Sequence, residues 1–102
     1  MGTNVYVKSG RVLDILAPST GTPTGPWMYK DAPKSAVQVV ADAAATVVIE
    51  ASNDGINANA TALGTVTLAA AGADGFTTDA PWKYIRARVT ANAGTVNVTI
   101  SN

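Results

Sequence analysis

The strongest constraint on the fold of this chain is a two-residue periodicity in its C-terminal part, residues 82–100. Before a turn at residues 92–94, apolar side chains occupy every second position, and Arg86 and Arg88 stand between them. After the turn the alternation resumes over residues 95–100, with Val or Ile at each even position. A period of two on both sides of a turn indicates an antiparallel β-hairpin with one buried face.

The rest of the chain contains further short strand-like runs and shows no helical periodicity. The expected strands before the final hairpin are residues 4–8, 11–16, 36–42, 45–52, 63–68 and 76–78. We expect the first two to pair as a hairpin, and the next two likewise. Turn signals separate the runs, such as Asp54-Gly55, where glycine supplies the positive φ of a tight turn. The sequence predicts one all-β domain, residues 1–102, folded as an antiparallel β-sandwich or jelly roll of about seven to eight short strands.

Two of these expected strands, residues 36–42 and 45–52, are apolar at nearly every position. This composition is typical of a strand that is covered on both faces. In a sandwich, one face meets the opposite sheet. The other face then needs a second subunit, or another part of the same chain, to cover it.

Residues 17–35 form a Pro/Gly-rich segment that we expect to be an extended arm or a long loop. Four of the five prolines of the chain lie there. Proline fixes φ and lacks an N–H donor, so the segment cannot be an interior strand or a helix. Trp27, Met28 and Tyr29 within it would be costly to leave in water. Two interpretations stay open: these side chains close one end of the chain's own sandwich, or the arm docks on a neighbouring subunit.

The composition excludes several classes of function. The chain has no Cys, no His and a formal net charge of zero. Disulfides, thiolate metal sites and histidine-dependent acid–base chemistry are therefore impossible, and the lack of basic excess argues against nucleic-acid binding. Turn formation explains acids such as Asp54 and Asp74, and no dense run of acids predicts a metal site. We expect no catalytic residue, no cofactor and no metal.

The first strand of the final hairpin places aromatic and basic side chains at alternate positions, and so on one face. Aromatic and Arg side chains are enriched at contact surfaces. This face could bind a protein, stack against a sugar through its aromatic rings, or be an ordinary solvated face whose Trp82 closes the sandwich end. The candidate interface residues are Trp27, Met28, Tyr29, Trp82, Tyr84, Arg86 and Arg88.

Three sequence phrases carry a resemblance to a known class of proteins. They are Ala-Ser-Asn-Asp-Gly at residues 51–55, Leu-Gly-Thr-Val-Thr-Leu at residues 63–68, and Pro-Trp-Lys-Tyr-Ile-Arg-Ala-Arg-Val-Thr at residues 81–90. From Thr46 to the C-terminus, the chain resembles small bacteriophage virion proteins of the head decoration (cement) type. The Pro-rich N-terminal third has no part in this resemblance.

The resemblance implies a compact β-fold without catalytic residues that sits, often as a trimer, where capsid subunits meet. We therefore expect a non-enzymatic homotrimer that binds the major capsid protein at the capsid surface of the virion and is assembled in the host cytoplasm. Contact with nucleic acid or membrane is not expected, since no apolar run is long enough to span a bilayer. Two alternatives stay open: a sugar-binding module of a phage tail or host-facing structure, and a head–tail joining or tail subunit.

Overall fold

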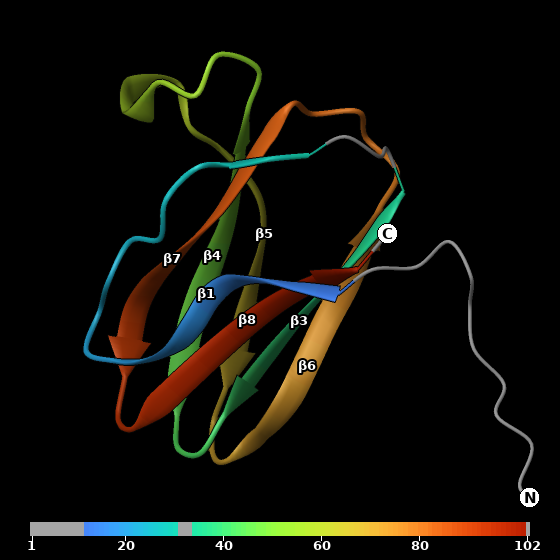
Figure 1. The fold of residues 1–102 in the computed structure, drawn as a ribbon. Helices are drawn as coiled ribbons and strands as arrows, with labels where there is room; N and C mark the ends of the chain where they lie inside the picture. The colour runs from blue at the N-terminus through green and yellow to red at the C-terminus, as the bar shows by residue number, and fades with distance from the viewer. Residues whose placement is uncertain (1–11, 31–33, 102) are drawn as a thin grey trace, which may run out of the picture.

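The computed structural model describes residues 12–30 and 34–101, which form two antiparallel four-stranded sheets packed face to face (Figure 1). The strands are β1 (Val12–Thr20), β2 (Met28–Tyr29), β3 (Ser35–Ala41), β4 (Ala45–Ser52), β5 (Thr61–Leu68), β6 (Gly72–Thr78), β7 (Tyr84–Asn92) and β8 (Thr95–Ser101), and one short 3-10 turn, η1, covers Asn57–Asn59. The predicted all-β sandwich is confirmed. The expected strand at residues 4–8, and with it the first hairpin, lies outside the described residues.

The strand order is β1-β8-β3-β6 in the first sheet and β2-β7-β4-β5 in the second sheet. The predicted hairpin over residues 82–100 is therefore wrong, because β7 and β8 belong to different sheets. The predicted pairing of β3 with β4 is wrong for the same reason. In each case the two consecutive strands lie in opposite sheets and face each other across the core. The alternation of apolar and polar residues is the same in this arrangement as in a hairpin.

Two of the connections that cross between the sheets, residues 42–44 and 93–94, lie against each other. The backbone N–H of Thr95 donates to Oδ1 of Asp42 over 2.6 Å, and the N–H of Ala93 donates to the carbonyl oxygen of Ala44 over 2.9 Å. A side chain on Gly94 would collide with the Asp42 carboxylate. The small residue at this position therefore lets the two crossings pack together.

The core lies between the two sheets and consists of the side chains that each alternating strand directs inward. Most of them are Val, Ile or Ala. Burial of apolar area stabilises the fold by about 25 cal/mol per Å². The clustered core residues are Ile15, Leu16, Val37, Val39, Ala41, Ala45, Val47, Ile49, Val66, Ile85, Ala87, Val89, Val96, Val98 and Ile100.

Residues 21–30 of the Pro/Gly-rich segment run along the edge of β7 that β4 does not occupy (Figure 1). The N–H of Gly25 donates to the carbonyl oxygen of Ala87 over 2.8 Å, and the N–H of Val89 donates to that of Pro23 over 2.9 Å. Two residues of the segment then form β2, which pairs with the start of β7. Residues 21–30 therefore extend the second sheet of their own domain. Docking of this segment on a neighbouring subunit stays a prediction.

Pro18 lies in a strand at the edge of a sheet, a position that the sequence rule for proline allows. β1 continues to Thr20 through Pro18, with register shifts between Asp14 and Leu16 and between Leu16 and Ser19. A proline is tolerated in an edge strand or at a bulge, where no ladder hydrogen bond is lost. In the first sheet, β1 is such an edge strand.

The strand predicted at residues 63–68 is confirmed as β5, and the short edge strand predicted at residues 76–78 is longer than expected. β6 begins at Gly72 and runs along β3, so part of the predicted small-residue loop is strand. A side chain on Gly75 would collide with the carbonyl oxygen of Val37. Pairing with β3 thus overrides the weak strand propensity of these small residues.

Candidate functional site

The seven candidate interface residues lie on β7 or beside it, at the edge of the second sheet that β2 extends. Met28 pairs with Ile85 and packs against the core, whereas Tyr29 pairs with Tyr84. The predicted common face of Tyr84, Arg86 and Arg88 holds, since the residues between them point into the core. The extent of exposure, however, differs sharply from one residue to the next.

Arg86 is only 8% exposed, although it points away from the core. Its Nε donates to Oε1 of Glu50 over 2.8 Å, and its Nη1 donates to Oδ1 of Asn57 over 2.8 Å. The guanidinium lies 4.5 Å from the centroid of the Trp27 ring, a cation–π geometry. Arg86 is therefore paired within its own chain, and its role in a contact with a partner stays a prediction.

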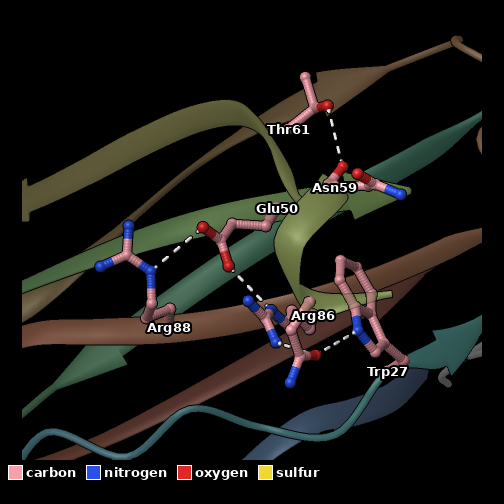
Figure 2. Close-up of polar contacts among 7 residues, drawn as sticks. Trp27, Glu50, Asn59, Thr61, Arg86 and Arg88 are labelled. Carbon is pink, nitrogen blue, oxygen red and sulfur yellow. Dashed lines mark hydrogen bonds and ion pairs between the residues drawn. The ribbon is translucent and has the colours of Figure 1, made fainter. Parts of the chain in front are cut away.

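Glu50 is the centre of this arrangement, which we call the Arg86 cluster: Trp27, Glu50, Asn57, Arg86 and Arg88. Figure 2 shows the Glu50 carboxylate between the two arginines. Its second oxygen, Oε2, accepts from Nε of Arg88 over 3.1 Å, and the Arg88 side chain stays 40% exposed. One buried carboxylate thus pairs with two cations.

The Arg86 cluster fastens two loops onto the second sheet. Trp27 comes from the Pro/Gly-rich segment, and its Nε1 donates to Oδ1 of Asn57 in η1 over 2.9 Å. Sequence reasoning did not single out Glu50 or Asn57. A signal for Glu50 existed, because it is a lone acid in an otherwise apolar run, and in the structure it stands directly opposite Arg86 in the β4–β7 register.

The turn after β4 is held by the carboxylate of Asp54. Oδ1 accepts from the hydroxyl of Ser52 over 2.6 Å and from the N–H of Ile56 over 2.9 Å, and Oδ2 accepts from Nδ2 of Asn59 over 2.7 Å. Gly55 follows with a φ of 68°, as the predicted Asp-Gly turn requires. Asp54 is therefore a turn residue.

These hydrogen bonds, first the one from Ser52 and then those from Ile56 and Asn59, lower the pKa of Asp54 from its ordinary value of 3.8. Because the folded pKa is lowered, its stabilising contribution is present above the unfolded pKa and is lost as the pH falls through the folded pKa. We expect a carboxyl NMR titration to give Asp54 a pKa below 3.8. Ser52→Ala should raise it, and an unchanged value in that variant would contradict this assignment.

Tyr29, Trp82 and Tyr84 lie at the corner of the second sheet where β7 begins, which we call the aromatic end of the second sheet. Tyr29 is 63% exposed, and its ring meets that of Tyr84 edge to face, with centroids 5.9 Å apart and planes at 76°. Trp82 lies just before β7 and lines a hollow of about 260 Å³ together with Asn53, Ala80 and Pro81. Of the seven candidate residues, Tyr29 is exposed, Arg86 is buried and the other five are half-buried.

Lys30 joins the aromatic end to the Pro/Gly-rich segment. Its side chain is buried, and its Nζ donates to the carbonyl oxygen of Ala80 over 2.9 Å. Its backbone N–H donates to the carbonyl oxygen of Lys83 over 2.7 Å. Burial lowers the pKa of Lys30, and its two contacts hold Tyr29 against the residues that precede β7.

The outer face of the first sheet is a second accessible surface. Alternate residues of β3 are buried, and Ala36, Gln38 and Val40 between them are exposed, with Val40 at 43%. The four strands of this sheet contain only two charged side chains, Asp14 and Asp74. Nothing in the described part of the chain covers this face, although the sequence predicts that β3 is covered on both sides.

The described residues place no three His, Cys, Asp or Glu side chains together as they would surround a metal ion. Among the same residues, no helix is long and apolar enough to cross a membrane.

Comparison with known proteins gives a likeness of fold. No protein-family model matches the chain, and no curated protein sequence matches it. The crystal structure of the SPBc2 prophage-derived protein YomS matches with a TM-score of 0.72 and 10% sequence identity, over 98% of this chain and 97% of YomS. A structure of Bacillus endospore appendages, described as disulfide-linked pili, matches with a TM-score of 0.44 and 16% identity, over 97% and 96% of the two chains. At 10% identity, what the chain shares with YomS is the sandwich fold along nearly its whole length.

Proposed function

We propose that this chain is a non-enzymatic structural protein of a bacteriophage particle that decorates the capsid and binds the major capsid protein. The observation that carries the proposal is the outer face of the first sheet, which is nearly uncharged and which no residue in the described ranges covers. The likeness to a prophage-derived protein over the length of both chains supports a phage origin. The sequence resemblance to head decoration proteins supports the role.

The outer face of the first sheet suits a large protein contact because its desolvation costs little free energy. Charged side chains are depleted at the cores of protein interfaces, since their desolvation is costly. Exposed Val12 and Val40 lie on this face beside small or neutral polar residues. The outer face of the second sheet is a poorer candidate, because the Arg86 cluster already occupies it.

In this proposal the chain is a homotrimer placed where capsid subunits meet, on the surface of a virion assembled in the host cytoplasm. It uses no cofactor and does not contact nucleic acid or membrane. Light scattering at micromolar concentration tests the trimer, which has a mass of about 31 kDa from three chains of 10.3 kDa. A ring of more subunits would instead favour the alternative of a head–tail joining or tail protein.

The direct test places positive charges on the outer face of the first sheet. Val40→Lys combined with Gln38→Lys is expected to lower the affinity for purified capsids about tenfold or more, because a buried unpaired charge is costly. Co-sedimentation with capsids that lack this protein measures the affinity. The matched control is Thr65→Lys with Thr67→Lys, at exposed positions on β5 of the other sheet.

The melting temperatures of both double variants should stay close to that of the unmodified chain, since all four positions are exposed or half-exposed side chains on outer faces. Equal capsid binding by the two double variants would refute the assignment of the first sheet as the contact surface. Failure of the unmodified chain to bind capsids of its own phage would refute the decoration role itself.

A further inference from the structure

We propose that the aromatic end of the second sheet binds a neutral oligosaccharide. Of the five aromatic residues among those described, four lie on or beside the start of β7: Trp27, Tyr29, Trp82 and Tyr84. Trp27 contacts Arg86 and Asn57 in the Arg86 cluster. The other three lie at the aromatic end, where Tyr29 is largely exposed and Trp82 and Tyr84 are half-buried. Such a concentration of aromatic rings outside the core is unlike the rest of the surface, which is rich in Thr, Asn and Ala.

The two tyrosine rings are held in place before any ligand arrives. Tyr29 and Tyr84 are register partners in β2 and β7, and their edge-to-face contact fixes both rings. Gly55 lies under Tyr84, since a Cβ at Gly55 would stand 3.7 Å from the ring. A rigid exposed ring loses little entropy when a flat ligand face packs on it, so this corner is preorganised for binding.

The hollow beside Trp82 supplies the polar group that a sugar needs. Oδ1 of Asn53 accepts from the backbone N–H of Lys83 over 3.3 Å, which orients the amide. The Asn53 amide nitrogen, a donor of two hydrogen bonds, has no partner within the described residues. An indole wall and an amide donor thus meet in one hollow of about 260 Å³.

The lining of the hollow decides the class of ligand. The four lining residues, Asn53, Ala80, Pro81 and Trp82, are all uncharged, and the charged side chains of Lys30 and Lys83 lie beside the hollow and do not line it. The volume is a little below the roughly 300–1,000 Å³ of pockets for drug-sized ligands, and it suits one ring-sized group. A neutral pyranose fits this description, since it offers an apolar C–H face to the indole and hydroxyl groups to the amide.

Tyr29 extends the site beyond this single ring. The contacts of Lys30 with Ala80 and Lys83 hold Tyr29 next to the segment that lines the hollow. A second sugar unit can then pack on the exposed Tyr29 ring while the first occupies the hollow. The site lies on the sheet opposite the proposed capsid contact, so the inference goes beyond the proposed function and does not rest on it.

A glycan array of neutral oligosaccharides, followed by isothermal titration calorimetry of the best-binding glycan with the full chain, tests the inference. We expect binding in the micromolar to millimolar range, weakened about tenfold by Trp82→Ala through the loss of stacking. Asn53→Ala should also weaken it. Thr67→Ala, an exposed position on β5, is the control and should bind as the unmodified chain does.

Tyr29→Ala is a second variant for the case that Trp82→Ala does not fold, because Tyr29 is largely exposed. Absence of binding by the unmodified chain to every neutral glycan would overturn the inference. Binding that is unaffected by both aromatic variants would also overturn it. Loss of capsid binding in folded Trp82→Ala, without any glycan affinity in the unmodified chain, would assign the corner to a protein partner instead.

Discussion

Glu50→Ala should lower the free energy of unfolding by about 3–5 kcal/mol, the cost of breaking a buried ion pair by removal of one partner. Glu50 is buried and its two carboxylate oxygens pair with Arg86 and Arg88. Without it, the buried Arg86 guanidinium keeps Asn57 and Trp27 as partners but loses its counter-charge. Urea denaturation followed by circular dichroism measures the change.

Arg88→Ala is the matched control for this prediction. The Arg88 side chain is 40% exposed, so its ion pair with the same carboxylate is screened by water and should contribute only about 0–1 kcal/mol. Equal losses in Glu50→Ala and Arg88→Ala would contradict the view that Arg86 is the buried member of the cluster. So would a Glu50→Ala protein of unchanged stability.

Ile49→Ala should lower the free energy of unfolding by about 2–5 kcal/mol, because it removes buried methyl groups and leaves a cavity. Ile49 is fully buried in the middle of β4, which pairs on both sides, with β5 and β7. Val48→Ala, at the neighbouring half-buried position on the outer face, should cost clearly less. Thermal unfolding of the two variants measures the difference, and a larger loss in Val48→Ala would mean that the core is misplaced.

The alternating pattern of the sequence correctly identified which side chains face the core. Val96, Val98 and Ile100 of β8 are buried, as are Ile85 and Val89 of β7. The same pattern could not identify strand partners, because the period of a strand's sequence shows which face each side chain occupies and does not show which strand lies beside it. Whether residues 93–94 close a hairpin or cross between sheets depends on the packing of the whole domain, including the contact with Asp42.

In the candidate site too, the sequence predicted which face a side chain occupies and did not predict which residues it contacts. Residue parity placed Arg86 and Arg88 on one face, and the structure keeps them there. It could not show that Trp27 and Asn57, from two distant loops, would bury Arg86. Burial of a charged side chain depends on such long-range contacts, so its exposure is not readable from its own strand.

For the Pro/Gly-rich segment, the sequence predicted only which structures are excluded. Its prolines exclude it from the interior of a sheet, and residues 21–30 lie at the edge of β7, as that rule allows. Its choice of this edge depends on Trp27 and on the backbone hydrogen bonds of Gly25 and Pro23. The sequence does not show that Trp27 would bind Asn57, or that Gly25 and Pro23 would bind Ala87 and Val89.

Electron cryo-microscopy of the purified phage particle is the direct test of whether this chain decorates the capsid through its first sheet. We expect density for this chain on the outside of the head, with the β1-β8-β3-β6 sheet turned toward the capsid subunits and the aromatic end turned away from them. A particle that lacks the chain, or one in which the first sheet faces solvent and the second sheet contacts the shell, would contradict it.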